Sequence, residues 1–283
     1  MKHTYIIVFL VLIQITIHND TTAQNLDFGV VVGLPSYSGD LSPQDFGIYF
    51  EDIRIGGGLF FRNQYSKRLG VRYGLTYGRI SASAPLRGAN GYRPNFLTDL
   101  YEASAIAEIT PFTIGYYDAG TIITPYLAVG LALFQFDPKT EFQGERIALQ
   151  PLGTEGQGLP GYSAPYRRLQ VSMPLGIGLK FVVQDKWTIG AEIVGRKTFT
   201  DHLDDRSAAT VVFGDIIQGN GELAGQLSNE NLQPTAENFE RTYQRGGEFD
   251  DWYYFSVLTV SYRFQSSDMV YKPGKKGVIC PRF

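Results

Sequence analysis

The sequence predicts an all-β protein, an eight-stranded antiparallel transmembrane β-barrel with long extracellular loops and short periplasmic turns. The first observation is strict alternation. In residues 168–181 every odd position, from Leu169 to Phe181, is apolar, and every even position is polar, glycine or proline. Such period-two alternation places the two sets of side chains on opposite faces of a strand. The second observation is length, because a strand that crosses an outer membrane at a tilt needs roughly 9–11 residues, whereas strands of soluble proteins usually have about five or six.

Eight segments show this alternation, and we predict them as the strands of the barrel. In chain order they are 26–35, 53–62, 69–77, 101–109, 125–136, 168–181, 187–199 and 254–264. The fourth segment is the weakest, because its outer face carries three alanines, Ala103, Ala105 and Ala107. No part of the chain between these segments suggests a second domain.

The third observation is the length of the connections. They are short after the second, fourth and sixth strands, at 63–68, 115–121 and 184–185, and long after the other strands, the longest being 201–251. Outer-membrane barrels have short turns in the periplasm and long loops outside the cell. We therefore expect an outer-membrane location with both ends of the barrel segment in the periplasm.

The first 23 residues resemble a secretory signal peptide. Lys2 and His3 are basic, residues 5–17 are apolar, and small residues precede a cleavage site after Ala23. A retained anchor is disfavoured because the apolar run is shorter than the ~20 residues of a spanning helix. The predicted domains are the signal peptide 1–23, the barrel 24–264 and a periplasmic tail 265–283. If the mature chain crosses a membrane, we expect it to do so as a closed barrel, because lipid offers no hydrogen-bond partners to the backbone groups at an open sheet edge.

The composition disfavours several classes of function. Lys and Arg number 25 against 28 Asp and Glu, a net charge of −3 that does not indicate a nucleic-acid partner. After removal of the signal peptide His202 is the single histidine, and Cys280 is the single cysteine of the chain. A zinc site therefore has almost no ligands available, and we predict no metal and no cofactor.

Inward-facing positions of the predicted strands carry charges of both signs, and we predict that they form an interior charge network. Its members are Asp27, Arg54, Arg62, Arg72, Glu102, Glu108, Lys180, Glu192, Arg196 and Arg263. An eight-stranded barrel is only wide enough for side chains to fill it, so these charges are expected to pair rather than to line a pore. A catalytic carboxylate pair is disfavoured because a filled lumen gives a substrate no access. We predict no catalytic residues and no enzymatic activity.

The start of the last long loop leaves alternatives open. His202 could serve a Ser-His-Asp site at the barrel rim. Asp201, Asp204 and Asp205 could hold calcium, although they lack the alternating spacing of a known calcium loop. We expect instead an acidic, solvated loop start. Apolar residues within 211–217 predict that part of this loop folds over the barrel mouth or contacts a partner.

Four segments resemble a known family. They are Tyr37-Ser-Gly-Asp-Leu41, residues 149–157, residues 198–205 and the terminal Cys280-Pro-Arg-Phe283. They are similar to the PorG-like family of Bacteroidota outer-membrane barrels, although His202 stands where a tyrosine is expected. The resemblance implies a non-enzymatic component of the type IX secretion system, a system associated with gliding motility. Its implied role is to anchor or dock the periplasmic ring built by the lipoprotein PorK and its partner PorN.

The tail 265–283 is basic, which fits a partner-binding role. It carries Lys272, Lys275, Lys276 and Arg282 against the single acidic residue Asp268. An odd cysteine in an exported protein indicates intermolecular pairing or a free thiol. Our hypothesis is that the tail contacts the periplasmic ring proteins, with a disulfide at Cys280 as one form of the contact and an unpaired thiol as the alternative. The alternative function is a surface-exposed barrel whose long loops bind a ligand or a host surface.

Overall fold

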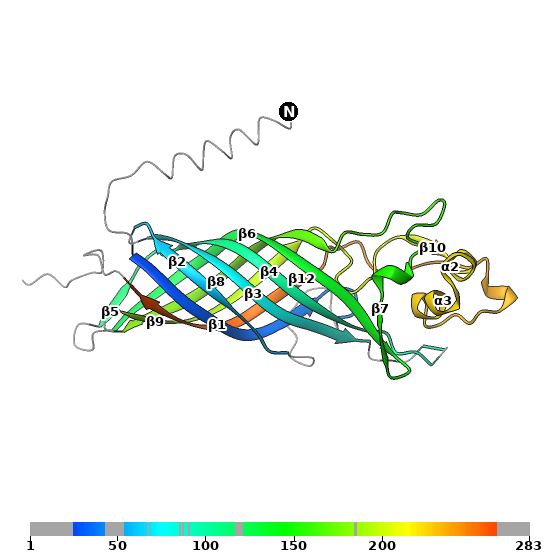
Figure 1. Cartoon of the computed structure of the whole chain (residues 1–283), viewed down its shortest axis with the longest axis horizontal. Coiled ribbons are helices and arrows are strands. Elements are labelled where there is room, and N and C mark those ends of the chain that lie inside the picture. The colour runs from blue at the N-terminus through cyan, green and yellow to red at the C-terminus, as the bar shows by residue number, and fades with distance from the viewer. Residues whose placement is uncertain are drawn as a thin grey trace, which may run out of the picture.

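A closed barrel of eight antiparallel strands dominates the structure (Figure 1). The computed structural model describes residues 25–42, 54–66, 68–84, 86, 88–89, 91–116, 121–183 and 186–264. The barrel strands are β1 (Asn25–Ser38), β2 (Gly56–Gln64), β3 (Leu69–Ser83), β4 (Asn95–Ile109), β6 (Thr121–Phe142), β8 (Leu169–Val183), β9 (Trp187–Thr198) and β12 (Trp252–Arg263). Each strand pairs with its neighbour in the chain, and pairing of β1 with β12 closes the ring. The predicted fold class is confirmed.

The smaller elements lie at the two ends of the barrel (Figure 1). β5 (Ile114–Tyr116) pairs with the start of β6 at the end that carries the short connections, which we call the turn end. The opposite end, called the loop end, carries a folded cap. Its elements are β7 (Glu145–Ala148), η1 (Gln150–Leu152), β10 (Thr210–Val212), α2 (Phe213–Asn220), α3 (Glu222–Ser228), η2 (Ala236–Asn238) and β11 (Thr242–Gln244). In the described part of the chain, no helix is long and apolar enough to cross a membrane.

The outer surface of the barrel is apolar because alternate residues of every strand point outward. In β8, Leu175 is 41% exposed and Ile177 is 62% exposed, whereas Ser172 and Lys180 are buried. Exposed Leu, Val, Ile, Phe or Tyr side chains occur on all eight barrel strands. A continuous apolar belt of this kind is the lipid-facing surface of a transmembrane barrel.

Aromatic side chains flank the belt at both ends of the barrel. Near the loop end, the rings of Tyr77 and Tyr101 lie 5.1 Å apart on neighbouring strands. Near the turn end, Trp187 and Tyr262 form a T-shaped pair with centroids 5.1 Å apart. Tyrosine and tryptophan prefer the membrane–water interface because one end of the ring is apolar and the other is polar. These pairs mark the two edges of the membrane-spanning part.

Three strands extend six residues further at the loop end than predicted. At the loop end β3 reaches Ser83, β4 already begins at Asn95, and β6 reaches Phe142, so the predicted ends at 77, 101 and 136 were wrong. Inward-facing Ile80 and Phe96 pack in a core that also contains Leu203 of the last loop. The strands therefore continue beyond the belt because the cap gives their inner faces a hydrophobic core.

Both ends of the barrel segment lie at the turn end, as predicted. Asp27 of β1 is the register partner of Arg263 of β12, and the amide of Phe264 donates to the carbonyl of Leu26 over 3.0 Å. The predicted signal peptide 1–23 and tail 265–283 lie outside the described residues.

Candidate functional site

The lumen is occupied by ion pairs centred on Glu108 of β4, whose side chain is 0% exposed. Arg62 Nε lies 2.7 Å from one carboxylate oxygen, and Arg72 Nε lies 3.4 Å from the other. The ammonium group of Lys180 also donates to Glu108. Three cations from β2, β3 and β8 thus meet one carboxylate. Buried charges persist only when they are paired and hydrogen-bonded in this way.

The network continues toward both ends of the barrel. Toward the turn end, Asp27 accepts from Arg62 over 3.4 Å and from Arg263 over 2.9 Å. In the other direction, Arg72 Nη2 lies 2.8 Å from Glu192, and the hydroxyl of Tyr126 donates to the same carboxylate. Every one of these side chains is nine-tenths or more buried.

A second ion pair lies closer to the loop end. Arg196 donates to both oxygens of Glu102, over 3.1 and 3.2 Å, and Tyr253 Oη donates to Glu102 over 2.8 Å. The cavity between the two groups of charges, next to Phe60, holds only about 20 Å³. That is room for about one water molecule. Between these two groups of charges, the described side chains therefore fill the lumen.

Nine of the ten predicted interior residues lie in these ion pairs, and Arg54 does not. The nine are Asp27, Arg62, Arg72, Glu102, Glu108, Lys180, Glu192, Arg196 and Arg263. Arg54 is exposed, and its Nε lies 3.5 Å from the hydroxyl of Ser81. The prediction for Arg54 was wrong because β2 begins only at Gly56, so this residue precedes the strand that would direct its side chain into the lumen.

A cluster of acidic residues joins the cap to the barrel mouth. Tyr37 Oη of β1 lies 2.9 Å from Asp204 and 2.9 Å from Asp251, which stand at opposite ends of the last long loop. All three side chains are buried. A hydroxyl has one hydrogen and can donate to only one carboxylate, so the second contact requires a proton on a carboxyl group. We call Tyr37, Asp201, Asp204 and Asp251 the mouth cluster.

The electrostatics of the mouth cluster favour protonated carboxyl groups. Burial raises the pKa of Asp204 to about 7, although nearby Arg206 opposes the shift. Burial, together with the charges of Asp40 and Asp204, raises the pKa of Asp201 to about 8. Burial also raises the pKa of Asp251, and the charge of Asp204 adds to this effect. A carboxyl group is costly to ionise where water is excluded and other carboxylates are near.

The expectation of a solvated loop start was wrong for two of its three aspartates. Asp204 is 2% exposed and Asp205 is 1% exposed, because the loop turns into the barrel mouth and Leu203 packs in the core beneath the cap. Among the described residues, no group of three or more His, Cys, Asp or Glu side chains is arranged to hold a metal ion.

A buried ion pair holds the two longest loops together. Arg245 Nη1 lies 3.1 Å from Asp205, and Asp205 also accepts from the hydroxyl of Thr154 in the preceding long loop. Glu155 accepts from the amide and the hydroxyl of Ser207, both over 2.7 Å. Burial raises the pKa of Glu155, whereas Arg245 opposes the shift. These contacts make one folded cap from two loops.

His202 lies beside this cap but lacks the partners of a catalytic histidine. Its ring stacks on Tyr166 with centroids 4.5 Å apart, and burial lowers its pKa. Its Nδ1 atom is buried without a hydrogen-bond partner, so no carboxylate orients the imidazole from this nitrogen. A Ser-His-Asp site needs such an orienting carboxylate.

That the separate motifs meet in space was not predicted from the sequence. Tyr37, Thr154 and Asp204 come from the three described segments that carry the family resemblance, and all lie at the barrel mouth. Arg245 and Asp251 complete the arrangement but stand in no motif. The predicted partner-binding residues of the tail, Lys272, Lys275, Lys276, Cys280 and Arg282, lie outside the described residues.

The chain matches the model of one known protein family. The model described as "Domain of unknown function (DUF6089)" matches residues 4–151, more than half of the sequence. The chain belongs to the DUF6089 family. No curated protein sequence matches the DUF6089 chain.

Solved structures similar to the DUF6089 chain are outer-membrane barrels and surface proteins. The outer membrane protein OprG from Pseudomonas aeruginosa is 12% identical with a TM-score of 0.43, over 86% of this chain and 96% of that chain. Neisserial surface protein A is 9% identical with a TM-score of 0.40, over 84% and 97%. The Escherichia coli outer membrane protein W is 11% identical with a TM-score of 0.36, over 87% and 100%. Similarities at this level carry no information about function.

Proposed function

We propose that this protein is a non-enzymatic outer-membrane component of the type IX secretion system. In this role the turn end faces the periplasm, and the tail 265–283 docks the periplasmic ring complex. The observation that carries the proposal is the filled lumen. Ion pairs around Glu108 occupy the interior of the barrel. The function is therefore expected to lie on the surfaces at the two ends of the barrel rather than in a channel through it.

The arrangement of the two ends supports docking at the turn end. The loop end is covered by a folded cap, whereas the turn end has short connections and both ends of the barrel segment. A tail that follows Phe264 begins at the turn end. Its basic residues suit an acidic partner surface, and the four segments similar to the PorG-like family point to the same role.

The test is a chain that ends at Phe264 and replaces the full chain in cells. Secretion of a type IX cargo is expected to fail, while heat-modifiable migration on electrophoresis shows that the barrel still inserts and folds. The variant Cys280→Ser distinguishes a disulfide contact from a contact made by the basic residues. Loss of secretion by this variant supports the disulfide, whereas normal secretion indicates that the basic residues of the tail make the contact. Normal secretion by the truncated chain contradicts tail docking.

A second candidate function is ligand binding at the loop end. It is favoured by a polar pocket of about 950 Å³ between the cap and the outer sides of β3, β4 and β6. In this case the folded loops, rather than the tail, carry the function. Substitutions in the pocket would then leave secretion unchanged and alter binding at the cell surface.

A further inference from the structure

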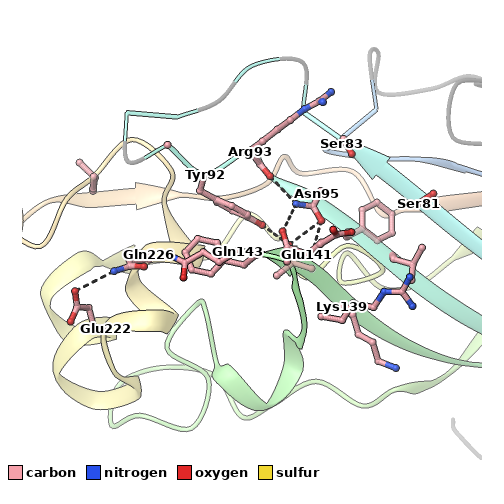
Figure 2. A pocket seen from close by; sticks show the side chains of 18 of the residues that line it. Ser81, Ser83, Tyr92, Arg93, Asn95, Lys139, Glu141, Gln143, Glu222 and Gln226 are labelled. Carbon is pink, nitrogen blue, oxygen red and sulfur yellow. Dashed lines mark hydrogen bonds between the residues drawn. The ribbon is translucent and has the colours of Figure 1, made fainter.

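The polar pocket at the loop end has the size and walls of a ligand site. Its volume is about 950 Å³, within the ~300–1,000 Å³ usual for ligand pockets. Ser81 of β3, Asn95 of β4 and Lys139 of β6 line one side, and residues of the last long loop, including Gln226 of α3, line the other. Figure 2 shows these side chains around the pocket. Segments far apart in the sequence thus build one concave surface.

Hydrogen bonds hold one wall of the pocket in place. Asn95 Oδ1 accepts from the amide of Glu141 over 2.8 Å, and Asn95 Nδ2 donates to the carbonyls of Glu141 and Arg93 over 3.0 and 2.9 Å. Tyr92 and Thr140 share a hydrogen bond of 2.7 Å between their hydroxyls. Figure 2 draws these bonds as dashed lines. A wall fixed before binding reduces the entropy cost of binding.

The pocket is basic, although the loop beside it is acidic. Its lining includes Arg54, Arg93, Lys139 and Arg146 against Glu141 and Glu222, so four cations face two anions and the difference is +2. By contrast, residues 201–251 contain eleven acidic residues and three arginines. A local excess of positive charge with hydroxyl and amide donors favours an anionic, hydroxyl-rich ligand.

The pocket lies directly above the lipid-facing surface of the same strands. Along β3, the outward positions run from Leu75 in the belt through Tyr77 at the aromatic edge to Ser81 in the pocket. With a rise of ~3.3 Å per residue and a tilt of ~40°, the four residues from Tyr77 to Ser81 span about 10 Å along the membrane normal. The headgroup of a lipid beside the barrel therefore reaches the pocket.

An apolar groove lies below the pocket on the same strands. It has a volume of about 700 Å³ and includes Leu75 of β3, Ala103 and Ala105 of β4, and Leu133 of β6. The small outward side chains of β4 leave space there between larger neighbours. A groove of this shape in the lipid-facing belt accepts an acyl chain.

We propose that these two features form one site for a glycolipid of the adjacent leaflet. The phosphorylated sugar headgroup lies in the basic pocket, and an acyl chain lies in the groove along β4. Phosphate supplies the negative charge that the four cations favour, and sugar hydroxyls match the serine, asparagine and glutamine side chains. This inference does not depend on the role in secretion.

The test uses the full chain in detergent, titrated with bisphosphorylated lipid A and followed by native mass spectrometry. The variant Lys139→Glu/Arg146→Glu reverses two charges of the pocket and is expected to bind about tenfold more weakly, since each charge-assisted contact contributes modestly at an exposed site. The matched control, Arg68→Glu/Lys186→Glu, makes the same change at the turn end and is expected to bind as the wild type does. Heat-modifiable migration confirms folding of each variant.

Two further measurements test whether the ligand is a phosphorylated lipid or a soluble phosphorylated saccharide. Dephosphorylated lipid A is expected to bind about tenfold more weakly than the bisphosphorylated form, because the pocket cations lose their partner. Ala103→Leu/Ala105→Leu fills the groove and is expected to weaken lipid A binding without affecting a phosphorylated oligosaccharide that lacks acyl chains. The proposal is overturned if the pocket variant binds lipid A as tightly as the wild type does. It is also overturned if dephosphorylated lipid A binds as tightly as the bisphosphorylated form. Equal affinity for the acyl-free oligosaccharide and for lipid A also overturns it and indicates a soluble anionic saccharide instead.

Discussion

At the scale of single residues, Glu108 is the side chain on which the lumen depends most. It is fully buried and meets Arg62, Arg72 and Lys180. Glu108→Gln keeps the shape of the side chain but removes its charge, so three buried cations lose a shared partner. We expect the variant to be about 3–5 kcal/mol less stable, as for other broken buried ion pairs. Urea unfolding of the refolded barrel, followed by tryptophan fluorescence, measures the difference.

The matched control is Glu145→Gln, which makes the same change at an exposed position of β7. Its effect is expected within about 0.5 kcal/mol, as for most surface substitutions. An unfolding midpoint of Glu108→Gln equal to that of the wild type would show that the ion pairs around Glu108 contribute nothing to stability.

The mouth cluster makes docking of the cap dependent on pH. A carboxyl whose pKa is higher in the docked cap than in the undocked loop binds more protons when docked. For Asp204 the stabilisation is therefore complete below the ordinary pKa of ~4 and is lost as the pH rises through about 7. The electrostatic field at the mouth cluster also includes the charges of four other residues, which are Asp40, Asp201, Asp251 and Arg206.

Hydrogen exchange of the Leu203 amide, which donates to Asp251 over 2.8 Å, reports this equilibrium. After correction for intrinsic exchange, we expect the rate to be on the order of a hundredfold faster at pH 8 than at pH 5, because the docked pKa of about 7 lies two units above pH 5 and each unit corresponds to a tenfold change in an equilibrium constant. Asp204→Asn is expected to flatten the dependence. A corrected rate that does not vary with pH in the wild type contradicts the shared proton.

Period-two alternation predicted the direction of most lumen side chains, because in a strand the face of a residue follows from its position alone. It failed at Arg54, where the strand had not yet begun. It could not predict the contact of Tyr37 with Asp204, because these residues are 167 positions apart and the contact depends on how the cap folds. The burial of Asp204 has the same origin.

At the scale of elements, the cap depends on one arginine. Arg245 contacts Asp205 over 3.1 Å and also donates to backbone carbonyls at the end of α3. Arg245→Ala leaves Asp205 and Glu155 buried without their cation. We expect a local loss of about 3–5 kcal/mol in cap stability. Limited proteolysis is expected to cut residues 201–251 faster, while heat-modifiable migration of the barrel stays unchanged.

Arg241→Ala is the control for this change, because Arg241 is an exposed arginine four positions earlier in the same loop. It is expected to leave the cleavage rate of the cap unchanged. Equal cleavage of Arg245→Ala and wild type would mean that the ion pair with Asp205 does not hold the two loops together.

The ends of the barrel strands were harder to predict than their existence. The belt residues of β8 alternate without interruption, so the strand was evident from Leu169 onward. In β4 the outward alanines weakened the pattern, and the strand was predicted from 101 although it begins at Asn95. Those same alanines form the groove below the polar pocket. The residues that made the strand hard to recognise therefore give its outer face a distinct shape.

At the scale of the whole molecule, the barrel separates two surfaces of different character. The loop end carries a folded cap whose core and ion pairs are internal to it. The turn end carries short connections and the point at which the tail begins. The fold class and the position of both barrel ends were predictable because period-two alternation and loop length are properties of the sequence itself. The choice between docking at one end and ligand binding at the other depends on partners, which neither property describes.

Recovery of partner proteins tests the docking proposal most directly. The full chain, the chain ending at Phe264 and the pocket variant Lys139→Glu/Arg146→Glu are each purified from outer membranes in mild detergent. The amount of periplasmic ring proteins recovered with each is then measured. We predict that the full chain and the pocket variant recover the ring proteins equally and that the truncated chain loses them. Equal recovery by the truncated chain would contradict docking through the tail.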